Sequence, residues 1–295
     1  MEINWVITGG LGFIGLNLVL RIINKNCFET ISIIDKETSD ISFNKNYLLQ
    51  YLTDKVELRS KIKIYNFSID EENKVKKIMK KANVLIHLAA SAGVVESIKS
   101  PMSNFRENVE STIVLLNCLK QYKNLRIIVA SSGAVLGDAK PPFSEKTNVS
   151  PISPYGAGKA AVEQYCKAFS FTYGLNIICC RFSNVFGPFS MHKKTVVRRM
   201  FETGMKSSQI HITGDGRQTR DFLFVRDLVD ALILISKKEN LVSFDIVNIS
   251  TFKETSILEI AKKVKIFIER SNAQEVQIKF KKGIKGEVLK SFSDY

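Results

Sequence analysis

Cysteine is scarce in this sequence, and its spacing argues against a bound metal. The five cysteines form no CxxC motif and no other spacing that is typical of metal ligands. Two of them are adjacent in an apolar run that is typical of a buried strand. We therefore expect no metal site and reduced thiols in the core, at Cys27, Cys118, Cys166, Cys179 and Cys180.

The sequence also lacks a membrane segment, an internal repeat and a low-complexity linker. No basic and apolar leader precedes the first predicted strand at about Ile3, and no apolar run is long enough to span a bilayer. The length of 295 residues, with 45% hydrophobic and 24% charged residues, is typical of a globular protein. We expect a cytoplasmic protein with one large domain or a large domain and a smaller lobe.

Acidic residues are fewer than basic ones, 29 against 43, which gives a formal net charge of +14. Such an excess is compatible with a polyanionic partner, either nucleic acid or a membrane surface. The lysines, however, are spread through predicted helices as well as bunched near the C-terminus. This distribution is more typical of a solvated basic surface, so we expect neither nucleic acid nor a membrane as a partner.

A glycine-rich segment near the N-terminus is typical of a dinucleotide site. An apolar strand precedes Gly9, Gly12 and Gly15, and an amphipathic helix follows. Glycine lets the backbone turn tightly and lets N–H groups approach a pyrophosphate at the start of the helix. Asp35 ends the next predicted strand and can accept from both hydroxyls of an adenosine ribose, whereas it would repel a 2′-phosphate. We predict NAD rather than NADP, with NADP left open by Lys36.

Strand and helix patterns alternate along the first half of the chain, which predicts a parallel, doubly wound α/β sheet of the Rossmann type. Ligands of such a sheet bind beyond the carboxyl ends of its strands. Residues His87–Ala90 and Ser131–Gly137 follow two of these strands. Ser132 is then placed to meet a substrate hydroxyl, unless it only ends a strand as a turn residue.

A tyrosine and a lysine lie four residues apart on one predicted helix, 154–173. Ser153 can cap this helix, Pro154 fits its first turn and Gly174 can end it. Tyr155 and Lys159 would share a face, and an ammonium near a phenol favours the phenolate. The pair could then act as a general base on a hydroxyl, although an exposed surface pair is the alternative.

Taken together, these motifs resemble the extended short-chain dehydrogenase/reductases of the nucleotide-sugar epimerase/dehydratase family, over nearly the whole chain. The resemblance is carried, in chain order, by TGGLGFIG (Thr8–Gly15), HLAA (His87–Ala90), ENVEST (Glu107–Thr112), SSGAVLG (Ser131–Gly137), YGAGK (Tyr155–Lys159), RFSNVFGP (Arg181–Pro188), GDGRQTRDFLFVRD (Gly214–Asp227) and KGEVLKSFSD (Lys285–Asp294).

The resemblance implies roles for particular residues. Tyr155 would take a proton from a sugar hydroxyl that Ser132 steers, and Lys159 would hold the nicotinamide ribose and lower the pKa of Tyr155. Asn184 and Arg220 would bind the substrate diphosphate. The residues implied to bind NAD are Gly9, Gly12, Phe13, Ile14, Gly15, Asp35, Ile69, Leu88, Ala89, Ala90, Asn108, Tyr155 and Lys159.

Departures from the family pattern bear on the reaction. The family's 4,6-dehydratases have an Asp-Glu pair after the serine or threonine, where this chain has Gly133 and Ala134. The resemblance therefore favours 4-epimerisation of a nucleotide-diphosphate sugar over dehydration. A 4-dehydrogenase that releases the keto sugar and a non-catalytic, RNA-associated NAD-binding relative are the alternatives. Ile284 replaces an arginine that is usual near the C-terminus, where Lys282 or Lys285 could supply the charge instead.

The predicted domains are an NAD-binding domain over 1–183 and a mainly substrate-binding lobe over 184–295, interleaved with sheet elements around 226–250. Similar enzymes pair two helices with their copies in a four-helix bundle, so we expect a homodimer. The predicted contacts lie on helices 101–121 and 154–173, at Val109, Ile113, Leu116, Ala161, Tyr165 and Phe169.

Overall fold

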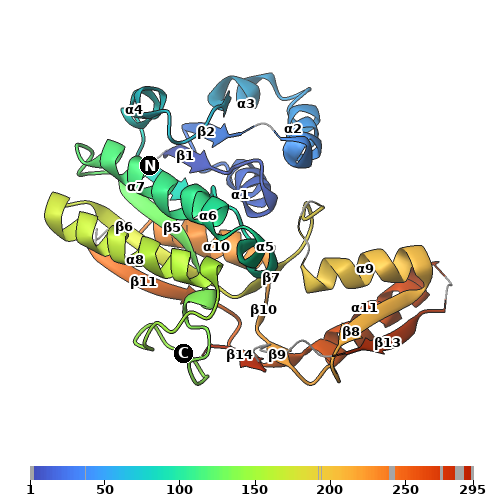
Figure 1. Cartoon of the computed structure of the whole chain (residues 1–295). Helices are drawn as coiled ribbons and strands as arrows, with labels where there is room; N and C mark the ends of the chain where they lie inside the picture. Colours follow the sequence, from blue (N-terminus) through green and yellow to red (C-terminus); the bar gives the residue numbers. More distant parts are fainter. Residues whose placement is uncertain are drawn as a thin grey trace.

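A seven-stranded parallel sheet forms the centre of the molecule (Figure 1). The computed structural model describes residues 3–36, 38–191, 193, 195–238, 243–272, 275–282 and 289–293. The strands lie in the order β11 (Phe244–Ile249), β6 (Asn176–Phe182), β5 (Arg126–Ser132), β4 (Val84–His87), β1 (Asn4–Thr8), β2 (Thr30–Asp35) and β3 (Ile62–Asn66).

Helices cover both faces of this sheet, so its strands are apolar on both sides. On β2, Ile33 belongs to one core cluster and Ile34 to the other, because successive side chains of a strand point to opposite faces. The first face is covered by α1 (Phe13–Asn24), α2 (Ser39–Tyr51) and α10 (Val225–Ser236). The second is covered by α4 (Glu72–Met79), α7 (Ser111–Leu119) and α8 (Pro154–Tyr173). The predicted doubly wound α/β sheet is confirmed.

The predicted helix over 101–121 is not a regular α-helix. It consists of α6 (Pro101–Phe105), a π-helical segment (Arg106–Glu110) and α7. The Ser111 and Thr112 hydroxyls donate to the Glu107 and Asn108 carbonyls, and such bonds compete with the regular helical ladder. Two short helices, α3 (Val56–Lys61) and α5 (Val94–Lys99), were not predicted.

The remaining elements form a smaller lobe to one side of the large sheet (Figure 1). Its core lies between α9 (Val196–Ser207), α11 (Ile257–Asn272) and the parallel pair β8 (Gln209–Thr213) and β13 (Gln277–Lys281). Short strands join the lobe to the large sheet: β7 (Asn184–Phe186), β9 (Thr219–Arg220), β10 (Phe222–Phe224), β12 (Thr255–Ser256) and β14 (Lys290–Ser291). Ile284 and Lys285 lie outside the described residues.

All five cysteines are unpaired thiols, and all but Cys27 are buried. Reduced thiols in the core therefore agree with the sequence pattern. Among the helices of the described ranges, none is long and apolar enough to cross a membrane.

Two leucines on α10 give a matched test of core packing. Leu232 has no exposed surface, whereas Leu234 is 73% exposed. Leu232→Ala should lower the free energy of unfolding by about 2–5 kcal/mol, because it removes buried methyl groups and leaves a cavity. Leu234→Ala should change it by less than about 0.5 kcal/mol. Urea unfolding of both variants measures the difference, and equal effects would contradict the position of α10.

Candidate active site

Helix α8 begins and ends where the sequence predicted. The Ser153 hydroxyl accepts from the Gly156 N–H at 3.1 Å, Pro154 occupies the first turn, and Gly174 ends the helix with φ of 65°. The Tyr155 N–H donates to Ser97 Oγ of α5 at 3.1 Å, which fixes the first turn from outside. Ser97 was not identified from the sequence.

Gly156 allows the start of α8 to approach the chain after β5. A Cβ atom at this position would lie 2.4 Å from the Ala134 carbonyl oxygen, which is inside any permitted contact. Ser132 ends β5, and its Oγ caps the short 3-10 helix Gly133–Val135 by accepting from the Ala134 N–H at 3.2 Å. The close approach brings Tyr155 and Ser132 together, so that the Ser132 hydroxyl acts on the pKa of the phenol.

The third predicted catalytic residue, Lys159, is 5% exposed and points into the sheet. Its Nζ donates to the Ala130 carbonyl of β5 at 2.7 Å, two residues before Ser132. Burial lowers the pKa of Lys159 to about 8. Ser132, Tyr155 and Lys159 thus gather at the carboxyl end of β5.

The expected lowering of the Tyr155 pKa by Lys159 is not found. Burial raises the pKa of the phenol, and the hydrogen bond from Ser132 opposes this only in part. The ammonium is instead bonded to the strand backbone, because a buried charge needs an acceptor. The phenol is therefore neutral at pH 7 in this state.

The glycine segment lies at the carboxyl end of β1, beside the loop after β4. Gly9 has φ of 67°, and a Cβ atom there would lie 2.7 Å from the Ala89 nitrogen. A Cβ at Gly15 would lie 2.2 Å from the Gly9 carbonyl oxygen, so α1 can pack on the turn only with glycine there. Gly12 is the N-cap of α1, and Phe13 and Ile14 form its first turn.

Asp35 ends β2 and faces the glycine segment. Its two carboxylate oxygens accept from the N–H groups of Leu11 and Lys36, each at 2.9 Å. Burial raises the pKa of Asp35, although the Leu11 hydrogen bond and the charge of Lys193 oppose this. Ile69, which is implied to bind NAD, is 6% exposed and belongs to the second core cluster.

The loop after β4 is held by asparagine side chains. Asn108 accepts from the Ser91 N–H at 2.7 Å and donates to the Ser91 carbonyl at 2.9 Å, and Asn104 donates to the same carbonyl. Asn108 therefore positions the Leu88–Ala90 segment. His87 lies beneath this segment between the Thr8 and Thr112 hydroxyls, and burial lowers its pKa to about 3, so it is neutral.

The predicted substrate residues lie where the lobe joins the large sheet. The Asn184 N–H donates to the Asp221 carbonyl at 2.9 Å, and the Arg220 guanidinium donates to the Thr219 carbonyl at 2.7 Å. A cavity of about 330 Å³ lies nearby, between the loop after β7 and α9; it is lined by Phe186, Gly187, Pro188, Phe189, Ser190, Met191, Thr195, Val197, Arg198 and Phe201.

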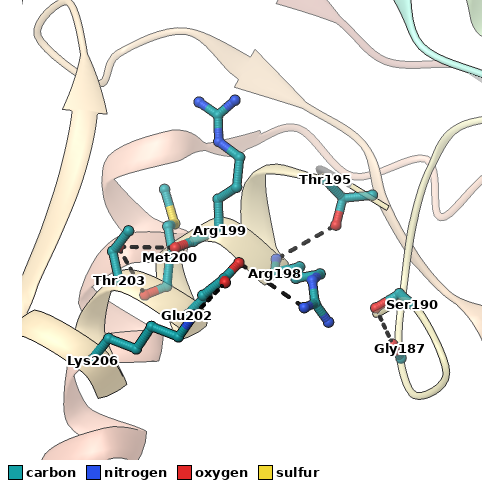
Figure 2. Close-up of polar contacts among 9 residues, drawn as sticks. All are labelled: Gly187, Ser190, Thr195, Arg198, Arg199, Met200, Glu202, Thr203 and Lys206. Carbon is teal, nitrogen blue, oxygen red and sulfur yellow. Dashed lines mark hydrogen bonds and ion pairs between the residues drawn. The ribbon is translucent and has the colours of Figure 1, made fainter. Parts of the chain in front are cut away.

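Figure 2 shows polar side chains on the α9 side of this cavity. Thr195 Oγ1 caps α9 by accepting from the Arg198 N–H at 3.4 Å. The Arg198 guanidinium is 4.0 Å from the Glu202 carboxylate, which in turn pairs with Lys206. Sequence reasoning missed Arg198, although adjacent arginines after an NVFGP motif could have indicated it.

A family model matches most of this chain. The NAD dependent epimerase/dehydratase family matches residues 5–250. The chain belongs to this family. The predicted resemblance is confirmed. The predictions of an enzyme and of NAD as its cofactor are confirmed as properties of this family.

Individual relatives differ in the reactions they are named for. The chain is 34% identical to a putative UDP-glucose 4-epimerase of Methanocaldococcus jannaschii, over 86% of this chain and 79% of the relative. It is 32% identical to a dTDP-glucose 4,6-dehydratase of Haemophilus influenzae, over 80% of this chain and 71% of the relative. A solved UDP-glucuronic acid 4-epimerase from Bacillus cereus, in complex with UDP-glucuronic acid and NAD, is similar with a TM-score of 0.85, 25% identity and coverage of 99% and 90%.

The glycine turn and Asp35 of this chain have the geometry that NAD binding needs. At Gly9 and Gly15 a side chain would collide with backbone, so this turn stays bare at the start of α1, where N–H groups favour a pyrophosphate. The Asp35 carboxylate lies against the same turn and could accept from ribose hydroxyls. When bound, NAD would supply the hydride acceptor for oxidation of a sugar hydroxyl.

Asp35 gives a test of cofactor choice. NAD should bind more tightly than NADP, because the carboxylate would repel the 2′-phosphate. Asp35→Ala should reduce this preference by about tenfold or more, whereas Lys36→Ala should leave it or increase it. Calorimetric titration with both cofactors measures the ratio. Equal or tighter binding of NADP by the unaltered protein would contradict the assignment.

Proposed function

We propose that this enzyme epimerises a nucleotide-diphosphate sugar at C4 through a transient 4-keto sugar, with NAD as its cofactor. The observation that carries the proposal is the close approach of α8 to the turn after β5, which gathers Tyr155, Ser132 and Lys159 at the carboxyl end of β5. This is an arrangement for moving one proton to and from a hydroxyl.

Each of the three side chains has a distinct task in this reaction. Tyr155 accepts the proton of the sugar O4 hydroxyl as hydride leaves C4, and returns it when the hydride comes back to the other face. Ser132 orients the same hydroxyl. Lys159 provides a cation on the same helix, and a cation brought closer to the phenol would lower the Tyr155 pKa from its raised value.

The residues after Ser132 favour epimerisation over dehydration. Elimination of water needs an acid for the leaving hydroxide and a base for the adjacent carbon. Gly133 and Ala134, in the 3-10 helix that Ser132 caps, can supply neither. Loss of water by that route is therefore not supported.

The nucleotide part of the substrate is proposed to enter the cavity between the loop after β7 and α9. The rings of Phe189 and Phe201 offer apolar walls, and Arg198 adds a guanidinium at the cavity. Asn184 and Arg220, at the junction of the lobe and the sheet, are proposed to contact the diphosphate.

Replacement of the proposed base tests the reaction. Tyr155→Phe should keep the fold and NAD binding but lower turnover by about 10²–10⁴-fold, because only the proton acceptor is lost. Ser132→Ala should lower turnover less, since it removes one hydrogen bond. Incubation with a panel of nucleotide sugars, read by NMR, identifies both substrate and product.

The same assay separates the alternatives. An epimerase returns the hydride, so absorbance of reduced nicotinamide should not build up with turnover. Accumulation of NADH in step with a keto sugar would instead establish a 4-dehydrogenase. Unchanged rates in Tyr155→Phe would contradict both enzyme proposals.

We also propose a homodimer, with a contact surface that keeps Tyr165 of the predicted residues but not Val109 or Leu116. Val109 and Leu116 are each 1% exposed and belong to the second core cluster, so they cannot contact a partner. Exposed apolar side chains lie instead on α5, α6 and α8, which contact one another; they are Ile98, Met102, Phe105 and Tyr165.

A charge placed on this surface should dissociate the dimer. Met102→Glu would bury a carboxylate against an apolar partner surface, which opposes association. Leu234→Glu, on α10 over the other face of the sheet, is the matched control and should leave the dimer intact. Light scattering at micromolar concentration measures the mass, and a monomer in the unaltered protein would contradict the proposal.

A further inference from the structure

A buried ion pair lies behind the proposed catalytic residues. The side chains of Glu163 on α8 and Arg181 on β6 are 0% and 2% exposed. Arg181 Nε and Nη2 donate to the two Glu163 oxygens at 2.9 and 2.8 Å, which is a bidentate arrangement. The Ser131 hydroxyl donates to one of these oxygens at 2.5 Å.

Stability alone does not account for this pair. Taking two charges out of water is unfavourable by several kcal/mol per ion, and apolar replacements of such pairs are often neutral or stabilising. The third guanidinium nitrogen, Arg181 Nη1, is buried and has no hydrogen-bond partner in the part of the chain that the structure describes.

The position of the pair connects it to the active site. Arg181 lies opposite Ser131 in the register of β5 and β6, and Ser131 precedes Ser132. Glu163 lies one helical turn after Lys159 on α8. The ion pair therefore joins α8, which carries Lys159, to β6. The Ser131 hydroxyl joins this pair to β5, which carries Ser132.

The pair also determines which acceptor Lys159 uses. A lysine and a glutamate four residues apart on a helix ordinarily attract each other. Here Arg181 and Ser131 occupy the Glu163 oxygens, and the Lys159 ammonium donates to the Ala130 carbonyl. The Glu163 carboxylate is therefore paired with β6, and the Lys159 ammonium stays bonded to β5.

We propose that Arg181 is a positioning residue for Lys159: by holding the Glu163 carboxylate, it keeps that charge from capturing the ammonium and so sets the pH range over which Lys159 is charged and free to act. This rests on the proposed function in taking Lys159 as the cation that serves the cofactor ribose and Tyr155.

The electrostatic surroundings of Lys159 agree with this role. Burial lowers the pKa of Lys159 to about 8, while Cys179, Cys166 and Glu163 raise it and Lys193 lowers it. His87 is neutral, and the interaction with the Cys166 thiol, together with burial, raises the pKa of Cys179. The titratable groups that face Lys159 come from α8, β4, β6 and the loop after β7; they are Tyr155, Glu163, Cys166, His87, Cys179 and Lys193.

Opposite shifts in the two single variants are the test. Glu163→Gln removes the negative charge and leaves Arg181 unbalanced, so Lys159 should lose its proton at a pH lower by about one unit. Arg181→Met leaves the carboxylate to act on Lys159, so the shift should be upward by a similar amount. The double variant keeps the net charge of the cluster and should titrate close to the unaltered protein.

The titration is measured directly by NMR of protein labelled with ¹³C at lysine Cε, with NAD absent. The Lys159 signal is the one missing from Lys159→Met. The pH dependence of turnover, whose alkaline limb should move with this signal, is a second readout. If no sugar is turned over, the proposed function fails while the NMR titration still decides the role of Arg181.

Arg126→Met is the matched control. Arg126 is also a buried arginine of this sheet, but it lies at the other end of β5 and donates to the Ile235 carbonyl. It should lower the melting temperature without moving the Lys159 titration. If Arg181→Met does not fold, the Lys159 titration in Glu163→Gln decides the test, because glutamine keeps the shape of the glutamate side chain. Shifts of the same sign in both variants, or lower melting temperatures with no shift, would overturn the proposal.

Discussion

The close approach of α8 to the turn after β5 is the contact on which the site depends. Gly156 permits it, since any side chain there would meet the Ala134 carbonyl. Ser153 and Ser97 then fix the first turn of α8, and Ser132 caps the turn that α8 touches. Tyr155 is thereby held against Ser132 by backbone geometry and is not left to find its partner through side-chain flexibility.

Burial governs the charges of the site more strongly than spacing along the helix does. The spacing of Tyr155 and Lys159 predicts mutual contact, but a buried ammonium needs a good acceptor and finds it in the Ala130 carbonyl. The result is a neutral phenol with a raised pKa above a lysine with a lowered one. For Tyr155 to act as the proposed base, bound substrate and cofactor would have to lower its pKa. The phenol therefore stays protonated until they are bound.

Much of the fold could be predicted because its signals are local. Alternating strands and helices, the glycine segment and the caps of α8 are each read from fewer than about thirty residues, the size of one βαβ unit. The features that escaped prediction depend on distant partners. The Asn104 side chain donates to the Ser91 carbonyl from another element, and Glu163 pairs with Arg181 of β6. Val109 is buried in the core, although the resemblance to dimeric enzymes made it a candidate for the dimer contact.

The reaction is decided by a few side chains on a shared fold, since relatives of similar identity are named as epimerases and as dehydratases. Hydride removal at C4 is common to both reactions, so Ser132, Tyr155 and Lys159 cannot distinguish them. The two reactions diverge at the step after oxidation. With Gly133 and Ala134 after Ser132, that turn offers no acid or base for the loss of water, which supports the proposed return of the hydride.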